Sequence, residues 1–353
     1  MSGIFSKRHG SIPITGKGAV YPSGDADIFL SSGKEGIIMG LHDPINRREA
    51  VKRIAGLTGS LALGVVIGDS FCSVGPAMAG VKQAGFLVEG KGTGKEYSVR
   101  ALVREVFEAA GGIGRFVARG DVVAIKPNVS WARPPGLAAT TNPEVLKAVI
   151  ELCQEAGAKK VRIADHTIHD ARRCFALTGV GTVAAETGAD LIYPRSSLMR
   201  DMKIGGSRLD VWPVFVPLVE ADKVINIPVA KHHSLSVLTL GMKNWIGGVG
   251  GGRWSLHQDI NQSIVDLTRF FKPTVTLIDA IRIMTRNGPS GGSKEYVSEK
   301  NTLLLSDDPV AVDARATLLF GKKPEDLGCV RLGQKWGLGT ADFQALSVKK
   351  VTL

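Results

Sequence analysis

The stretch Asp-Val-Val-Ala-Ile-Lys-Pro at residues 121–127 decides the fold class of this chain. A continuous apolar run that ends at a proline is typical of a strand buried on both faces of a sheet. Asn142 and Pro143 come next, and an Asn cap followed by Pro predicts the start of a helix, here over residues 144–156. The apolar run at residues 160–164 predicts another strand. A buried strand, a helix and a second strand together indicate a parallel α/β unit.

The same alternation continues along the chain. We expect an α/β fold with a mostly parallel sheet, helices on both faces and Rossmann-like layering. Ligands of such sheets bind beyond the carboxyl ends of the strands, so residues that directly follow a strand are the candidates for a site. Further strands are predicted at residues 191–192, 211–216, 223–227, 274–279 and 302–305, and further helices at residues 171–177, 180–187, 235–246, 260–271 and 309–320.

The composition is that of a globular protein with an excess of positive charge. The 353 residues include 44 Lys and Arg against 33 Asp and Glu, a formal net charge of +11, and 44% are hydrophobic. These values argue against a disordered, collagen-like or disulfide-scaffold chain. A basic chain has nucleic acids, anionic membranes and small acidic molecules as candidate partners. Residues 1–79 carry 8 basic and 6 acidic side chains, so most of the excess lies in residues 80–353.

The N-terminal part resembles an export signal. A basic cluster with Arg47 and Arg48 precedes an uncharged apolar run at residues 54–68, and Ala-Met-Ala at residues 77–79 fits a cleavage site. We interpret residues 39–79 as a twin-arginine signal peptide, with Met39 as the true initiator. Residues 1–38 are then a gene-start artefact or a disordered extension. The alternative is an amphipathic or buried helix that happens to begin with arginines.

This interpretation sets the remaining domain boundaries and the location of the protein. Residues 80–353 would form the mature α/β domain, with its core over residues 121–321. The run at residues 54–68 is too short to cross a bilayer, so no stable transmembrane segment is expected. We expect an exported, periplasmic or extracytoplasmic protein whose partners include the twin-arginine export machinery. Nucleic acid is excluded as a partner, because export separates the protein from it and only 6% of residues are aromatic.

The cysteines predict no metal cluster. The mature chain would keep Cys153, Cys174 and Cys329, with no C-x-x-C pair and no run of four cysteines. The chain therefore lacks a recognisable iron–sulfur or zinc-ribbon motif. Cys153 lies in the apolar pattern of a predicted helix and is most simply a packed core thiol.

The first candidate site residues follow the strand at residues 121–126. Lys126 and Asn128 stand at its carboxyl end, where a lysine and an amide could hold a carboxylate or a phosphate. The alternative is a solvated lysine beside a Pro-Asn turn.

A second cluster follows the strand at residues 160–164. Asp165, His166 and His169 are residue types that bind divalent metals, and a nearby carboxylate can orient a ligating imidazole. They are the candidate metal ligands, so a divalent metal is one candidate cofactor, and the sequence does not identify the cofactor. The alternative is a plain loop in which Asp170 caps the helix that begins at Ala171.

The third cluster is the richest in chemistry. Lys231, His232 and His233 follow a predicted strand, and a predicted helix would place Thr239 and Lys243 on one face. The glycine-rich segment at residues 247–252 would let the backbone approach a ligand or move as a lid. Lysine and arginine side chains could bind an anion, and a histidine could move a proton. We predict His232, His233 and Lys243 as catalytic residues, and Lys126, Asn128, Lys231, Asn244, Gly248, Arg253 and Asn287 as ligand-binding residues.

Two apparent motifs do not fit their structural context. Residues 288–292 match G-x-S-x-G, but no strand precedes them and no helix follows directly, as a nucleophile elbow requires. Residues 90–95 suggest a phosphate loop, but Glu96 stands where Ser or Thr must bind magnesium. No G-x-G-x-x-G follows a strand, so a nicotinamide dehydrogenase has no support.

An ordered series of motifs resembles the domain of unknown function family 362. The series is Val-Ala-Ile-Lys-Pro-Asn at 123–128, Thr-Asn-Pro at 141–143, Lys-His-His at 231–233, Leu-Gly-Met-Lys-Asn at 240–244, Ile-Asp-Ala at 278–280, Asn-Gly-Pro at 287–289 and Ser-Asp-Asp-Pro-Val-Ala-Val-Asp at 306–313. The resemblance spans residues 121–321. Some relatives carry a ferredoxin-type module, but this chain lacks its cysteines. The aspartates of residues 306–313 could equally offset a helix dipole.

Two classes of function follow from these patterns. The first is an exported enzyme that acts on a small anionic substrate, with Lys and Arg binding the anion, a histidine as acid or base, and a metal or redox cofactor left open. The alternative is a non-catalytic extracytoplasmic ligand-binding or redox-accessory protein. The latter would need the lysines and glycines but not the histidines.

Overall fold

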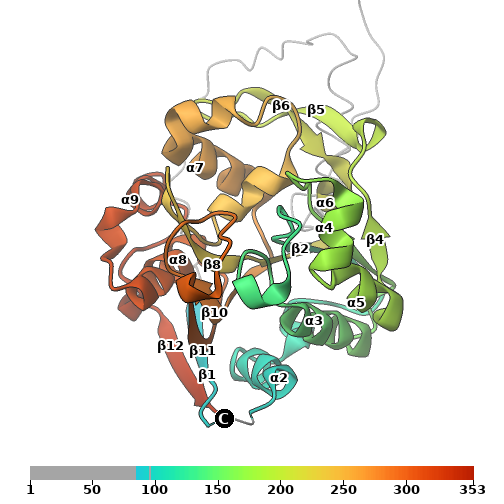
Figure 1. The fold of residues 1–353 in the computed structure, drawn as a ribbon, viewed down its shortest axis with the longest axis vertical. Helices are drawn as coiled ribbons and strands as arrows, with labels where there is room; N and C mark the ends of the chain where they lie inside the picture. Colours follow the sequence, from blue (N-terminus) through green and yellow to red (C-terminus); the bar gives the residue numbers. More distant parts are fainter. Residues whose placement is uncertain (1–84, 95–96) are drawn as a thin grey trace, which may run out of the picture. The chain divides into compact units, whose positions relative to one another are not determined.

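The computed structural model describes residues 85–94 and 97–353 (Figure 1). The predicted signal peptide at 39–79, the initiator Met39 and the assignment of residues 1–38 lie outside these residues. Within the described ranges, none of the helices combines the length and the apolar character needed to cross a membrane.

One sheet forms the centre of the domain and confirms the predicted fold class. Strands β4, β3, β2, β7 and β10 are parallel neighbours, whereas β11 runs antiparallel to β10 and to β1, and β12 pairs in parallel with β1. The strands are β1 (Phe86–Lys91), β2 (Val122–Pro127), β3 (Lys160–Ala164), β4 (Asp190–Ile192), β7 (Lys223–Ile227), β10 (Val275–Met284), β11 (Val297–Ser306) and β12 (Ser347–Thr352). Of these strands, β1 and β12 were not predicted from the sequence.

Helices cover both faces of this sheet (Figure 1). On one face, Phe107, Val149 and Val183 belong to one buried apolar cluster, and on the other Ile264 and Val312 belong to a second. The first face carries α2 (Val99–Ala109), α3 (Pro143–Glu155), α4 (Ala171–Leu177) and α5 (Val180–Thr187), and the second carries α6 (Val216–Val219), α7 (Ile260–Phe271), α8 (Pro309–Thr317) and α9 (Gly328–Lys335).

The start of α3 illustrates how local sequence sets these elements. The side chain of Asn142 accepts a hydrogen bond from the backbone of Glu144 at 3.1 Å, and Pro143 occupies the first helical position. Asp170 caps α4 in the same way, by accepting a hydrogen bond from the Arg173 backbone at 3.0 Å. Both helix starts were predicted from these residues, and Asp170 has the capping role that was considered for it.

The predicted helix at residues 235–246 is wrong. This segment holds β9 (Val237–Thr239), which forms a hairpin with β8 (Val229–His233), and then a 3₁₀ segment, η5 (Lys243–Gly248). A tertiary contact explains the difference, because the two carboxylate oxygens of Asp313 accept hydrogen bonds from the backbones of Gly241 and Met242. The apolar residues from Leu238 to Ile246 are thus buried without a continuous helix.

The predicted strand at residues 211–216 exists but lies outside the main sheet. It is β6 (Val211–Phe215), which pairs antiparallel with β5 (Met199–Lys203) in a separate two-stranded sheet. Strand β8 follows β7 after Pro228 and pairs in parallel with β10. It extends the chain beyond the carboxyl end of β7 and forms the first strand of the hairpin with β9.

Candidate functional site

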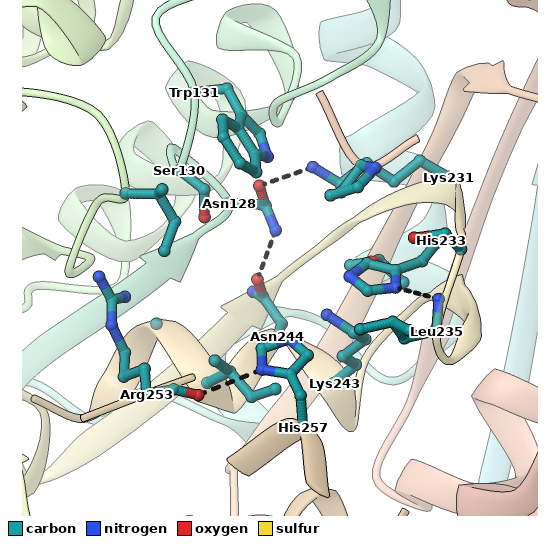
Figure 2. Close-up of a pocket in the computed structure, with 16 residues that line it drawn as sticks. Asn128, Ser130, Trp131, Lys231, His233, Leu235, Lys243, Asn244, Arg253 and His257 are labelled. Atoms are coloured by element: carbon teal, nitrogen blue, oxygen red, sulfur yellow. Dashed lines mark hydrogen bonds between the residues drawn. The ribbon is translucent and has the colours of Figure 1, made fainter. Parts of the chain in front are cut away.

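A cavity of about 280 Å³ opens beyond the carboxyl ends of β2 and β3, where the fold class predicts a ligand (Figure 2). The loops after β2 and β3, the β8–β9 hairpin and η5 form most of its wall. The lining residues are Asn128, Ser130, Trp131, Ile168, Lys231, His233, Ser234, Leu235, Thr239, Lys243, Asn244, Ile246, Gly247, Arg253, His257 and Pro289.

The charged groups of this wall are all cationic. Lys231, Lys243 and Arg253 line the cavity, and the described part of the chain contributes no Asp or Glu to it. Burial, and then the charge of Lys243, lowers the pKa of Lys231 well below its usual value. Burial lowers the pKa of Lys243 to about 8. A lowered pKa means that the folded protein destabilises the charged form of the lysine, and a bound anion would stabilise that form.

Two of the three cations have fixed protein partners. Lys231 Nζ donates a hydrogen bond to Asn128 Oδ1 at 3.2 Å and another to the Ala139 carbonyl. Arg253 donates to the carbonyl oxygens of His166 at 2.6 Å and of Thr167 at 2.8 Å. These contacts fix both side chains at the cavity before any ligand binds.

Lys243 and Thr239 differ from them. Among the described residues, no hydrogen-bond acceptor and no carboxylate contacts Lys243 Nζ, although the side chain is only 8% exposed. The hydroxyl of Thr239 is buried and has no hydrogen-bond partner in the same part of the chain. Both groups line one cavity, and a polar ligand could pair with the ammonium of Lys243 and accept a hydrogen bond from the hydroxyl of Thr239.

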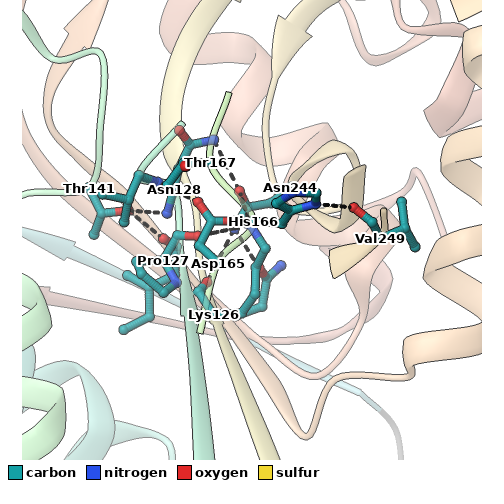
Figure 3. A network of polar contacts seen from close by, with 12 residues as sticks. Lys126, Pro127, Asn128, Thr141, Asp165, His166, Thr167, Asn244 and Val249 are labelled. Atoms are coloured by element: carbon teal, nitrogen blue, oxygen red, sulfur yellow. Dashed lines mark hydrogen bonds and ion pairs between the residues drawn. The ribbon is translucent and has the colours of Figure 1, made fainter. Parts of the chain in front are cut away.

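A buried polar network supports the cavity from behind (Figure 3). Lys126 Nζ lies 2.7 Å from Asp165 Oδ1, and it also donates a hydrogen bond to Asn244 Oδ1 at 3.1 Å. Asn128 Nδ2 donates to the same oxygen of Asn244 at 3.1 Å. Lys126 therefore positions the two amides of the cavity wall and does not line the cavity itself.

Gly247 allows this network to pack. A Cβ atom at Gly247 would lie 2.1 Å from Asp165 Oδ1 and 2.7 Å from Lys126 Nζ, distances that no side chain tolerates. The glycine lets the backbone of η5 lie directly over the ion pair, and its carbonyl accepts a hydrogen bond from the His166 backbone at 2.8 Å. The glycine-rich segment thus supplies close approach at Gly247, as expected for such residues.

The two histidines of the cavity are in different hydrogen-bonding states. Nδ1 of His233 accepts hydrogen bonds from the backbones of Leu235 at 3.1 Å and Ser236 at 3.3 Å. The neutral ring must then carry its proton on Nε2. Burial, followed by the charge of Lys243, lowers the pKa of His233 to about 2, so this ring stays neutral and offers an N–H group.

His257 has the opposite tautomer. Its Nδ1 lies 3.2 Å from the Arg253 carbonyl, an oxygen that can only accept, so Nδ1 carries the proton and Nε2 keeps a lone pair. Its ring stacks on that of His233, with centroids 6.2 Å apart (Figure 2). His257 was not predicted from the sequence. The available signal was its position four residues after Arg253.

Side-chain alternation along β8 separates the predicted catalytic histidines. Lys231 and His233 face the cavity, whereas His232 is not part of its lining and its Nδ1 accepts a hydrogen bond from the Gly288 backbone at 3.2 Å. The structure therefore places His233 and Lys243 together and His232 apart from them.

Other predicted ligand-binding residues fall into two groups. Asn128, Lys231, Asn244 and Arg253 line the cavity. Gly248 does not, because it packs beside Phe271, whose ring a Cβ would meet at 2.7 Å. Asn287 does not line it either, although Pro289, two residues later, does. Trp131 and Leu235 were missed because their residue types carry no anion-binding chemistry.

The predicted metal ligands engage other groups. Asp165 pairs with Lys126 and also accepts a hydrogen bond from the Val129 backbone at 2.6 Å. His166 Nδ1 lies 2.8 Å from the Val249 carbonyl, and His169 Nδ1 accepts a hydrogen bond from the Ala132 backbone at 3.3 Å. Over residues 85–94 and 97–353, no three His, Cys, Asp or Glu side chains are grouped to hold a metal ion. The metal-ligand prediction thus finds no support in this geometry.

These features define a class of protein, a mostly parallel α/β domain whose strand ends enclose a cavity lined by lysine and arginine side chains. The chain belongs to the family described as Domain of unknown function (DUF362), whose model matches residues 123–317. This match confirms the family that the sequence motifs indicated.

Two similar proteins add context. The Thylakoid-associated protein sll1697 of Synechocystis sp. (strain ATCC 27184 / PCC 6803 / Kazusa) is 28% identical over 256 residues, which cover 68% of this chain and 76% of that protein. The lactate racemase apoprotein from Thermoanaerobacterium thermosaccharolyticum aligns with 13% identity and a TM-score of 0.36, over 62% of this chain and 54% of that one. The chain thus spans about half of that solved structure.

Proposed function

We propose that the protein is an exported enzyme that binds a small anionic substrate in this cavity and moves a proton within it. The observation that carries the proposal is a cavity with Lys231, Lys243 and Arg253 in its wall and no carboxylate from the described residues. A bound carboxylate or phosphate would compensate the unpaired charge of Lys243 and could accept a hydrogen bond from Thr239.

The two histidines support proton transfer with divided roles. His257 presents a lone pair at Nε2 and can take a proton, whereas His233 presents an N–H and can donate a hydrogen bond to an oxygen of the substrate. This assignment moves the base from His233, whose pKa is lowered to about 2 mainly by burial, to its neighbour. Lys126 and Asp165 act as positioning residues behind the wall.

Export is the second part of the proposal and is independent of the site. It depends on the pattern of residues 39–79, which fits a twin-arginine signal that would carry the folded domain to the periplasm or another extracytoplasmic space. The cyanobacterial relative is named for an association with thylakoids, which is compatible with a protein that works at or beyond a membrane. A divalent metal is not needed for this proposal.

A non-catalytic binding protein is the alternative. Burial contributes most to the low pKa of His233, and this pKa favours the alternative. A ring that stays neutral can donate a hydrogen bond to a bound ligand, but it does not take up a proton from it. Such a protein would need the three cations but not the lone pair of His257.

Binding and hydrogen exchange distinguish these functions. Titration calorimetry with pyruvate, lactate and inorganic phosphate should show binding to the wild type and weaker binding to Lys243→Gln. Exchange of the pyruvate methyl protons in D₂O, followed by NMR, should be accelerated by the wild type and lost in His257→Asn. Binding that His257→Asn retains, without accelerated exchange in either protein, would support the binding protein, and absence of any binding would overturn both.

A further inference from the structure

We propose that Lys243 is a nucleophile whose amine forms an imine with the carbonyl carbon of a small oxo acid held in the cavity. This inference rests on the proposed anion site and narrows its substrate class to acids that carry a carbonyl group. It concerns covalent chemistry, which anion binding alone does not require.

The three lysines around the cavity differ in what their amines contact. Lys126 Nζ is paired with Asp165 and hydrogen-bonded to Asn244. Lys231 Nζ donates hydrogen bonds to Asn128 and to the Ala139 carbonyl. Both amines are thus engaged in holding the wall together. Lys243 Nζ has no such partner among the described residues, so its amine is the one available for reaction.

The position of Lys243 matches this role. It begins η5, its side chain is buried, and it reaches into the cavity beside the rings of His233 and His257 (Figure 2). Its charge lowers the pKa of Lys231, of His233 and of His257, and all four residues line the same cavity. A nucleophile therefore lies between the anion-binding groups and the groups that can handle protons.

The protonation state of Lys243 supports nucleophilic attack. Burial lowers its pKa to about 8, and the charge of Lys126 acts in the same direction. A substantial fraction of the amine is then neutral near pH 8, whereas an exposed lysine is almost fully protonated there. Desolvation beside another cation is a known way to activate a lysine amine.

The surrounding groups complete the reaction. Arg253 and Lys231 would hold the carboxylate of the oxo acid, and the Nε2–H of His233 would donate a hydrogen bond to its carbonyl oxygen. A proton leaves the Lys243 ammonium for His257 Nε2, and the free amine then attacks the carbonyl carbon. One of the two protons of the amine passes to the carbonyl oxygen, which gives a neutral carbinolamine. The C–O bond breaks as His257 returns a proton to the leaving hydroxyl. The products are one iminium and one water, with no change in net charge and no oxidant or reductant.

The size of the cavity limits the substrate. About 280 Å³ is at the small end of ligand pockets, so the acid should have only a few carbon atoms. Pyruvate and glyoxylate are suitable probes, and lactate has the same carboxylate without the carbonyl.

Reductive trapping tests the inference. The wild-type protein is incubated with pyruvate and sodium cyanoborohydride at pH 8, and the products are analysed by intact mass and by peptide mapping. We expect one reduced adduct per chain on Lys243, at least tenfold more than on the exposed Lys350, and suppressed by excess lactate. Lys243→Arg should show no adduct while its circular dichroism and urea midpoint remain close to those of the wild type.

The outcomes separate this inference from the proposed function. If calorimetry shows that lactate and pyruvate bind but trapping leaves Lys243 unmodified, the imine is excluded and the anion site stands. If the label spreads evenly over exposed lysines and lactate does not protect Lys243, the inference is also overturned. If neither acid binds, both the proposed function and the inference fail.

Discussion

The ammonium group of Lys126 lies 2.7 Å from the carboxylate of Asp165, and both side chains are almost completely removed from solvent. Lys126 belongs to β2 and Asp165 directly follows β3, so the pair joins the ends of two adjacent strands at the cavity. Burial lowers the pKa of Lys126, and Asp165 opposes that shift. The pair is therefore a structural support for Asn128 and Asn244, and neither partner is free to bind a ligand.

Removing the charge of Asp165 should destabilise the protein strongly. Asp165→Asn leaves the Lys126 ammonium buried without a counter-ion, which we expect to cost about 3 to 5 kcal/mol of unfolding free energy. Urea unfolding measures the effect. The control is Glu186→Gln, which breaks the exposed pair with Lys147 and should cost about 0 to 1 kcal/mol. Equal costs for the two variants would contradict the supporting role of Asp165.

Gly247→Ala should perturb the same ion pair of Lys126 and Asp165 by steric overlap. The added methyl group would collide with Asp165 and Lys126, so we expect a loss of about 1 to 3 kcal/mol and weaker ligand binding. Gly136→Ala is a matched control, because a Cβ there meets nothing within 4 Å. Urea midpoints and calorimetry on both variants check this, and an unperturbed Gly247→Ala protein would show that the contact is not tight.

The affinity for a carboxylate should fall as the pH rises. Burial lowers the pKa of Lys243 to about 8, so its positive charge is present below that pH and lost above it. A carboxylate stays ionised throughout this range, and only the protein changes. Calorimetric titration of lactate from pH 6 to pH 9.5 should show a decline centred near pH 8 that is absent in Lys243→Gln. A flat profile in the wild type would remove Lys243 from the anion site.

Lys243 should also weaken the folded state. Its folded pKa of about 8, lowered by burial, is below that of the unfolded chain, so the unfolded state binds more protons between the two values and stability rises with pH in that window. Lys243→Met should therefore be more stable than the wild type at pH 7, by about 1 to 3 kcal/mol, and should lack that rise. Urea unfolding at pH 7 and pH 9.5 tests this, and a less stable variant at pH 7 would contradict it.

His232, which lies outside the cavity, and His257, which lines it, should respond differently to substitution. His232→Asn should leave lactate affinity within about twofold, because His232 is outside the cavity and Asn can still accept the hydrogen bond from Gly288. His257→Asn should reduce catalysed hydrogen exchange by about 10² to 10⁴-fold with little change in affinity. A large loss of affinity in His232→Asn would place that residue back at the site.

Regular segments with clear caps were predictable from the sequence. Asn142 with Pro143, and Asp170, marked helix starts correctly, and the buried runs at β2, β3 and β7 were recognised. Strand β12 was missed because it lies at the sheet edge and carries exposed lysines, a pattern that does not differ from a surface loop. The segment after β8 was misread as a helix because Asp313, about 70 residues away, fixes its backbone.

The cationic residues of the cavity wall were predictable from the sequence. Lys231, Lys243 and Arg253 were identified from their charge and from glycine-rich surroundings, and the structure brings them together. Sequence alone could not show that Lys126 turns inward to Asp165, because that pairing depends on the register of β2 against β3. Nor could it assign tautomers, which for His233 and His257 follow from backbone contacts made by folding.

Because side chains alternate between the two faces of a strand, the register of β8 decides which of its residues line the cavity. Pro228 separates β7 from β8, and Lys231 and His233 reach the cavity because they stand at alternate positions of that strand. Adding a single residue just after Pro228 would present Ala230 and His232 in their place, whereas adding two would present Val229 and Lys231. A change of one residue in this short connection would therefore remove the lysine from the cavity wall, and a change of two would separate it from Asn128.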